Sequence, residues 1–249
     1  MHEHDAAEYG RHVAEDYDEI YGDLGDVEGA VARLVELVER SGGGPLLELG
    51  VGTGRLALPL VEAGVAVTGV DGSPAMLDHL LAKPGGDRVA TVVGDFSTLD
   101  IRGRYAVIAL VANTIYALPD QEAQVRTFRQ AAAHLEPGGR FVVEAWVPPC
   151  LPAGPALLPR LLPRGMAGVV VADHDPAGQR LATTQVVLGG RVGLRVFPVV
   201  HRYAWPAELD LMARLAGMVL EDRWADWRGT PFTGTSTDHV SVYRLPPGS

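Results

Sequence analysis

The chain of 249 residues is long enough for one large domain with a full apolar core. Hydrophobic residues make up 47% of the chain and charged residues 21%, which is typical of a globular protein. The formal net charge of −10 disfavours phosphate contacts, so we expect no nucleic-acid partner. No apolar run is long enough for a bilayer span, and the opening MHEHDAAEYG lacks the features of a secretory signal. We therefore expect a cytoplasmic protein with no membrane partner.

Short apolar runs alternate with amphipathic segments in the first part of the chain, which predicts a parallel α/β sheet. The expected strands are 46–50, 65–70, 89–93, 105–112 and 140–146. The expected helices are 27–40, 54–63, 74–83 and 120–135, and the PGG at 137–139 is expected to separate the last of these from the next strand.

The alternation breaks after Trp146. Residues 148–165 hold six prolines in eighteen positions, too many for a helix or a central strand, so we expect a connector there. Three strand-like runs, at 168–173, 181–189 and 192–205, then predict an antiparallel subsheet. A helix at 206–217 and two final strands at 219–227 and 238–245 are expected to follow. The predicted fold is α/β: a Rossmann-like, doubly wound, mostly parallel seven-stranded sheet with an antiparallel subsheet inserted after the fifth strand. The expected units are 1–147, 148–205 and 206–249.

The stretch LLELGVGTGRLAL carries three glycines, Gly50, Gly52 and Gly54, after a buried strand. A dinucleotide fingerprint needs the register G-x-G-x-x-G, but the sixth position here is Arg55. The preceding Glu48 would repel a pyrophosphate, whereas it suits a cofactor that bears an ammonium group and a sulfonium. The loop therefore points away from NAD.

Carboxylates stand at the ends of the next two strands. Asp71 ends VTGVD and can accept the two ribose hydroxyls of a nucleoside. Asp95 and Phe96 end VVGDF, offering an acceptor for an exocyclic amine beside an apolar ring, which is what adenine requires.

Together these motifs resemble the class I S-adenosylmethionine-dependent methyltransferases over about residues 45–147. The resemblance implies a glycine loop under the methionine part, ribose binding by Asp71, amine binding by Asp95, and Met76 and Phe96 beside the adenine. It also implies that the segment AEDYDEIYGD closes over the cofactor and offers a tyrosine. The implied cofactor-binding residues are Tyr17, Tyr21, Glu48, Gly50, Val51, Gly52, Thr53, Gly54, Asp71, Gly72, Ser73, Met76, Gly94, Asp95, Phe96, Ala112 and Asn113.

Methyl transfer from a sulfonium needs alignment and desolvation of the acceptor more than a dedicated base. The segment VANTIYAL after the fourth strand is expected to border donor and acceptor. Its Asn113 to Tyr116 keeps the first and last letters of the NPPY motif of nitrogen methylating enzymes but lacks both prolines. His201, His239 and Tyr116 are the candidate catalytic residues. A base near a hydroxyl acceptor would be His or Asp, and Asp238 stands beside His239.

No compact set of metal ligands occurs in the sequence, so we expect no metal. Trp146, Trp205, Trp224 and Trp227 are either pocket-lining or core residues.

The C-terminal half is similar to small-molecule methyltransferases of actinobacterial biosynthetic pathways. The architecture is similar to that of the deoxyamino-sugar N-methyltransferases, which implies a homodimer as one assembly. The leading hypothesis is methyl transfer from S-adenosylmethionine to an oxygen or nitrogen of a small metabolite. The alternatives are a non-catalytic module that binds this cofactor, and a dinucleotide-dependent oxidoreductase, for which no tyrosine has the required lysine four residues later.

Overall fold

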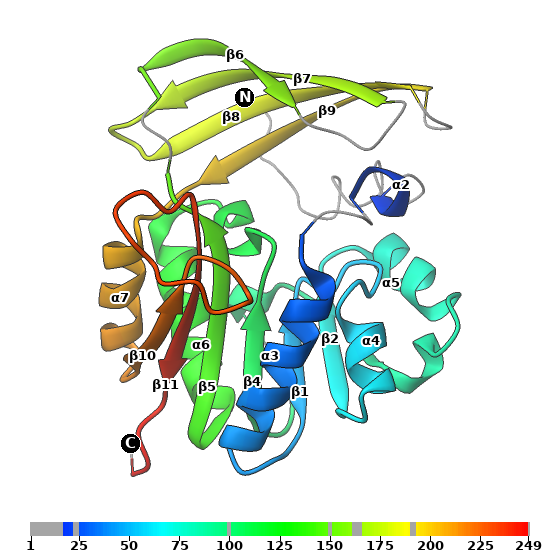
Figure 1. Ribbon diagram of the computed structural model, residues 1–249, viewed down its shortest axis with the longest axis vertical. Helices are drawn as coiled ribbons and strands as arrows, with labels where there is room; N and C mark the ends of the chain where they lie inside the picture. Colours follow the sequence, from blue (N-terminus) through cyan, green and yellow to red (C-terminus); the bar gives the residue numbers. More distant parts are fainter. Residues whose placement is uncertain are drawn as a thin grey trace.

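The computed structural model describes residues 17–21, 25–98, 101–148, 151–160, 166–189 and 193–248 (Figure 1). Within them the chain forms a seven-stranded sheet in the order β10-β11-β5-β4-β1-β2-β3 and a four-stranded sheet in the order β6-β7-β8-β9. The first five strands pair in parallel, and the last two complete the sheet in antiparallel fashion. The predicted fold class is confirmed.

The seven strands of the large sheet agree closely with the apolar runs in the sequence. They are β1 Leu46–Leu49, β2 Val67–Asp71, β3 Ala90–Val93, β4 Tyr105–Leu110, β5 Leu135–Trp146, β10 Val219–Trp224 and β11 Asp238–Arg244. Every residue of β1 and of β4 is buried, because helices cover both faces of the sheet.

The helices divide between the two faces of this sheet, as two apolar clusters show. α3 (Val27–Arg40), α4 (Ala57–Glu62) and α5 (Pro74–Leu81) pack on one face. α6 (Gln121–His134) and α7 (Pro206–Leu215) pack on the other. The remaining elements are α2 (Tyr17–Tyr21) and the short helices η1 (Gly86–Arg88), η2 (Phe96–Thr98) and η3 (Thr114–Ala117).

Local chemistry fixes where the helices begin. The Asp26 carboxylate accepts the Gly29 N–H at 3.0 Å before α3, and the Asp120 carboxylate accepts the Ala123 N–H at 2.7 Å before α6. Pro74 and Pro206 occupy first-turn positions, where a missing N–H costs nothing.

The fifth strand begins earlier than the sequence indicates. β5 starts at Leu135 rather than at Arg140, so the PGG at 137–139 lies inside the strand. Tyr105 pairs with Leu135 but Val107 pairs with Arg140, so the intervening residues bulge out of the ladder. The glycines make the bulge feasible, since Gly138 has a φ of +84°.

The proline-rich connector contains a strand that the sequence reasoning missed. β6 (Gly154–Arg160) pairs antiparallel with β7 (Met166–Asp175), and β8 (Arg180–Gly189) and β9 (Gly193–Arg202) complete the sheet. β6 is an edge strand and pairs on one side only. An edge strand can hold prolines such as Pro155, because the missing N–H groups need not belong to the paired side. The expected connector 148–165 thus includes an edge strand, which the exclusion of a helix and of a central strand had left open.

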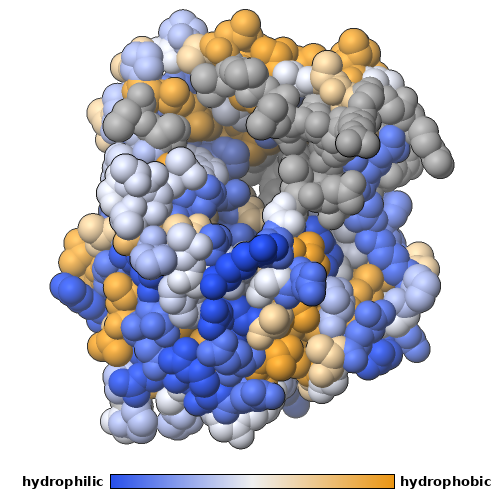
Figure 2. Space-filling view, in the orientation of Figure 1, coloured by the Kyte–Doolittle hydropathy of each residue, from blue (hydrophilic) through white to orange (hydrophobic). Residues whose placement is uncertain are grey.

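The four-stranded sheet lies across the carboxyl ends of the parallel strands, with α2 between it and the large sheet (Figure 1). Its outer face is apolar, and Leu157, Leu194 and Val196 are 71%, 61% and 58% exposed. Figure 2 shows the apolar side chains gathered along the top of the molecule, over this sheet.

A buried arginine attaches the four-stranded sheet to the helices below it. Arg202, at the end of β9, donates to the Gln124 side-chain oxygen on α6 at 2.7 Å and to the Glu208 carboxylate on α7 at 2.8 Å. The Gln124 amide donates in return to the Arg202 carbonyl at 2.7 Å. Because the Arg202 side chain is only 9% exposed, this ion pair is shielded from water.

Replacing Arg202 with leucine should lower the free energy of unfolding by about 3 kcal/mol, since it leaves Glu208 and Gln124 without their buried partner. Urea unfolding followed by circular dichroism measures the loss. Arg228→Gln is the control: it breaks the exposed ion pair with Asp26 and should leave stability unchanged. Equal effects of the two substitutions would contradict the anchoring role.

Candidate active site

Most of the predicted cofactor residues lie at the carboxyl edge of the parallel strands. β1 pairs with β2 on one side and with β4 on the other, so the chain connections diverge at this point of the edge. Open α/β sheets bind ligands in the crevice that such a divergence leaves. The glycine loop follows β1, Asp71 ends β2 and Asp95 follows β3.

The glycine loop is held against its neighbours but open on one side. Gly50, Gly52 and Gly54 have φ values of +73°, +55° and +84°. A Cβ on Gly50 would lie 2.6 Å from the Thr114 Cγ2 atom, and one on Gly54 would lie 2.9 Å from the Leu80 Cγ atom. A Cβ on Gly52 would meet nothing within 4 Å, so the loop leaves room there for a ligand.

Asp71 ties the glycine loop to the turn after β2. One carboxylate oxygen accepts the Gly52 N–H and the other accepts the Ser73 N–H, each at 2.8 Å. Burial raises the pKa of Asp71, and these two hydrogen bonds counteract the rise. Each oxygen keeps a lone pair, which suits a ribose diol. The next residue, Gly72, leaves room beside it, since a Cβ there would meet only the Gly94 carbonyl at 4.0 Å.

Glu48 is a buried carboxyl group beneath the loop, 3% exposed. Burial raises its pKa to about 8; Asp71 adds to the rise, whereas Arg55 opposes it. The Glu48 Oε2 atom has no hydrogen-bond partner among the described residues. An unpartnered buried acceptor under an open glycine loop fits a ligand that carries an ammonium group.

The helix α2 docks on the glycine loop through Asp18, which the sequence reasoning did not single out. The Thr53 hydroxyl donates to one Asp18 carboxylate oxygen at 2.6 Å, and the Lys83 ammonium contacts the other at 2.6 Å. Lys83 also donates to the Thr53 carbonyl at 2.9 Å. These contacts bring Tyr17, which lies in α2, to the cofactor edge, whereas the Tyr21 side chain falls outside the described residues.

The predicted adenine residues lie on the turns after β2 and β3. The Ser73 hydroxyl accepts the Met76 N–H at 3.4 Å and begins α5, in which Met76 is buried. The Asp95 carboxylate is exposed and accepts the Ser97 N–H at 2.7 Å, and the neighbouring Phe96 is half-buried. Adenine contact by these residues stays a prediction.

The segment after β4 forms an unusual turn. Ala112 and Asn113 both have left-handed backbones, with φ values of +54° and +65°. The Trp146 N–H donates to the Asn113 side-chain oxygen at 2.7 Å. That oxygen is therefore engaged with the backbone, so the partial match to the NPPY motif does not extend to a side-chain carbonyl that is free to bind an amine.

The environment of Tyr116 argues against its predicted catalytic role. Its side chain is fully buried, and its hydroxyl lies 2.9 Å from the Trp146 carbonyl and 2.8 Å from the Ala204 carbonyl. Burial raises its pKa well above the usual range. The hydroxyl thus joins η3 to β5 and to the segment after β9.

His239 is also fully buried, in β11 at the carboxyl edge. Its Nδ1 atom lies 2.9 Å from the Ser241 hydroxyl, and its Nε2 atom has no partner among the described residues. Burial and the nearby Arg223 guanidinium lower its pKa to about 4. The ring is therefore neutral at pH 7 and a weak base, which argues against the predicted catalytic role as a proton acceptor.

His201 is the predicted catalytic residue that remains accessible. It lies on β9, half-buried, with its ring centroid 6.1 Å from that of Trp146. His174 and Tyr203, which the sequence reasoning missed, lie beside them: the His174 Nε2 atom is 2.9 Å from the Tyr203 hydroxyl, and the Tyr203 and Trp146 rings are 6.0 Å apart. No local sequence signal identifies this pair, because β7 and β9 bring it together only in the fold.

The remaining candidates have mainly structural contacts. Trp227 is 4% exposed, Trp205 is 43% exposed, and Trp224 lies under the Arg33 guanidinium at 4.6 Å. Asp238 is exposed and accepts the Thr237 hydroxyl at 2.8 Å.

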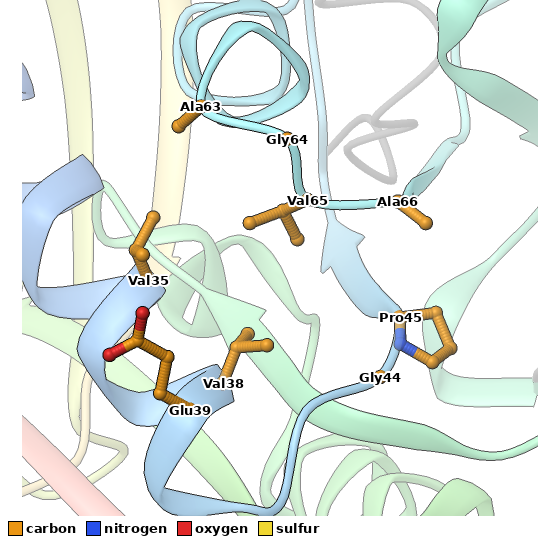
Figure 3. A pocket seen from close by; sticks show the side chains of 9 residues that line it. All are labelled: Val35, Val38, Glu39, Gly44, Pro45, Ala63, Gly64, Val65 and Ala66. Carbon is orange, nitrogen blue, oxygen red and sulfur yellow. The ribbon is translucent and has the colours of Figure 1, made fainter.

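A shallow hollow of about 470 Å³ lies at the opposite edge of the sheet, away from these residues. It is lined by the end of α3, by Gly44 and Pro45 before β1, and by residues 63–66 before β2 (Figure 3). The only charged side chain in its lining is that of Glu39, so the hollow offers little chemistry.

Within the described ranges, no group of three histidine, cysteine, aspartate or glutamate side chains is arranged to hold a metal ion. None of the helices in the described part of the chain is long and apolar enough to cross a membrane.

Comparison with known proteins agrees with this geometry. Residues 46–139 match the family model of a methyltransferase domain. Cypemycin N-terminal methyltransferase from a Streptomyces species is 31% identical over 241 residues, which cover 96% of this chain and 98% of that protein. The structure of the CcbJ methyltransferase from Streptomyces caelestis is 41% identical, with a TM-score of 0.88 over 98% of this chain and 100% of that one.

A third structure shares the fold. S-adenosylmethionine-bound CalS10, an amino pentose methyltransferase from Micromonospora echinaspora, has a TM-score of 0.67 at 21% identity, over 98% of this chain and 100% of that one. The sheet order and the glycine loop define a class I, Rossmann-like cofactor-binding protein. The chain belongs to the S-adenosylmethionine-dependent methyltransferases, and S-adenosylmethionine is its cofactor.

Replacing Asp71 with alanine should weaken binding of S-adenosylhomocysteine on the order of 100-fold, since it removes a charged acceptor and frees two loop N–H groups. Isothermal titration calorimetry measures the change, with the exposed Asp78→Ala on α5 as the control. Unchanged affinity, or tight binding of NAD by the unaltered protein, would contradict the assignment of Asp71.

The cofactor-free protein should become less stable as the pH rises from about 5 to 8. Over this range folded Glu48 keeps a proton that the unfolded chain has released, so rising pH favours unfolding, by a few kcal/mol in all. Glu48→Gln imitates the protonated form and should flatten this dependence. Urea unfolding at several pH values tests it, and parallel pH profiles for the two proteins would refute it.

Proposed function

We propose that the protein transfers the methyl group of S-adenosylmethionine to a nitrogen of a small metabolite of secondary metabolism, with oxygen as the alternative acceptor atom. The observation that carries the proposal is the open glycine loop above the buried carboxyl group of Glu48, whose Oε2 atom has no partner among the described residues, directly beside a left-handed turn. The name of the relative that is 31% identical over nearly the whole chain states N-terminal methylation, which supports nitrogen.

In-line displacement is the mechanism we propose. The cofactor supplies a methyl group that its sulfonium already activates. The protein then has to hold the acceptor in line and keep water away, and both tasks need rigid surroundings rather than a strong base. The four-stranded sheet, which lies across the carboxyl edge, is suited to covering the acceptor. Residues 148–205 are proposed as this covering unit, between the cofactor-binding unit 1–147 and the final unit 206–249.

The titratable side chains at the edge favour an acceptor that arrives unprotonated. His239 is neutral with a pKa of about 4, and Tyr116 keeps its proton, so neither would take a proton from an ammonium group. His201, on the inner face of the covering sheet, is the remaining candidate base if the acceptor is a hydroxyl.

Other features stay predictions of the sequence. These are a cytoplasmic location, independence from metals, a lack of nucleic-acid partners and a homodimer. The apolar outer face of the four-stranded sheet, which exposes Leu157, Leu194 and Val196, supports the homodimer, because monomeric proteins seldom expose large apolar patches.

Incubation with methyl-labelled S-adenosylmethionine and a small-metabolite extract of the host should yield a labelled product, whose methylated atom mass spectrometry identifies. We expect an N-methyl product. Binding of S-adenosylhomocysteine without any transfer would favour the non-catalytic binding module. Reduction or oxidation of a metabolite with NAD would favour the oxidoreductase.

A further inference from the structure

The carboxylate of Glu144 joins two segments that are far apart in the chain. One oxygen accepts the Ala112 N–H at 2.9 Å, in the turn after β4. The other accepts the Trp227 indole N–H at 2.7 Å, in the segment between β10 and β11. Trp227 is 4% exposed, so this second contact is largely shielded from water. Nothing in the cofactor contacts described above requires Glu144.

The turn that Glu144 holds is strained. Two consecutive residues other than glycine in the left-handed region cost on the order of 1 kcal/mol or more each, and they persist only where the surroundings impose them. In this protein the surroundings that impose the conformation are residues of β5. The Glu144 carbonyl accepts the Asn113 N–H at 3.1 Å, and the Trp146 N–H donates to the Asn113 side-chain oxygen. The Glu144 carboxylate adds the bond to Ala112.

The strained turn leaves two polar groups available. Among the described residues, no hydrogen bond reaches the Ala112 carbonyl or the Asn113 side-chain NH2 group. The turn adjoins the glycine loop, because Thr114 is the residue that a Cβ on Gly50 would strike. An acceptor that donates an N–H to the carbonyl would therefore lie next to the loop that binds the methyl donor.

We propose that Glu144 is a positioning residue for methyl transfer. Its carboxylate keeps the Ala112–Asn113 turn left-handed, and in that conformation the Ala112 carbonyl and the Asn113 amide orient the acceptor. The acceptor role rests on the proposed function, whereas control of the turn by Glu144 does not. Glu144 itself touches neither the donor nor the acceptor.

The test compares three variants. Glu144→Gln can satisfy only one of the two N–H donors, and Trp227→Phe keeps a ring but removes the indole N–H. The matched control is Arg140→Gln, four residues earlier in the same strand, where Arg140 donates to the Glu221 carboxylate at 2.6 and 2.9 Å. The control breaks a comparably shielded contact of β5 far from the turn.

Glu144→Gln should lower kcat about 10- to 100-fold, the usual cost of slight misalignment, while the dissociation constant for S-adenosylhomocysteine stays within about 2-fold. Trp227→Phe should lower kcat less, and the double variant should fall short of the product of the single effects. Arg140→Gln should lower thermal stability but not kcat. Unchanged kcat in Glu144→Gln, or an equal loss in Arg140→Gln, would overturn the proposal.

A second measurement needs no acceptor. Hydrogen exchange followed by mass spectrometry should show faster exchange of the 110–116 segment in Glu144→Gln and in Trp227→Phe, but not in Arg140→Gln. Unchanged exchange would overturn the control of the turn. If the unaltered protein transfers no methyl group to any metabolite, the proposed function and the acceptor role fail together, and the exchange data still decide whether Glu144 controls the turn.

Discussion

The close approach of the turn after β1 to the turn after β4 is the constraint on which the site depends. A Cβ on Gly50 would lie 2.6 Å from the Thr114 Cγ2 atom, so no side chain can be placed between the two turns. Neighbouring parallel strands end side by side, and here their turns also touch. The glycine loop and the turn after β4 are therefore held in one fixed relation, which is what the proposed in-line displacement requires.

The fifth strand connects these two turns to the rest of the molecule through hydrogen bonds. Glu144 and Trp146 hold the turn after β4, and the Trp146 carbonyl also receives the Tyr116 hydroxyl. The same hydroxyl reaches the Ala204 carbonyl just after β9, so the four-stranded sheet is tied to the carboxyl edge of the large sheet. Arg202 fastens the sheet a second time, to α6 and α7. Because both attachments are buried, the sheet has a defined position over the site.

The features that sequence reasoning could predict are those encoded within a few residues. The glycine register, the acidic end of β2 and the apolar periods fix the large sheet, because each depends on local backbone or burial requirements. The misses have long-range causes. β6 could be predicted only from its place at the edge of a sheet, where it pairs with β7 on one side and can hold prolines. The contact between Asp18 and Lys83 joins residues 65 positions apart in the sequence. Tyr116 and His239 were chosen by residue type, whereas only burial revealed that neither is suited to accept a proton.

Burial also sets the charge of two titratable groups near the carboxyl edge of the large sheet. Glu48 is held protonated beneath the glycine loop, and His239 is held neutral at the end of β11. Neither group therefore carries a charge at pH 7 before the cofactor binds, whereas the Asp71 carboxylate at the same edge accepts two N–H groups. Binding of a cofactor that carries an ammonium group shifts Glu48 from the protonated form toward the carboxylate, because a nearby cation favours the charged form. The charge of Glu48 is therefore set by the methyl donor, whereas the Ala112 carbonyl and the Asn113 amide, which we propose orient the acceptor, are neutral groups.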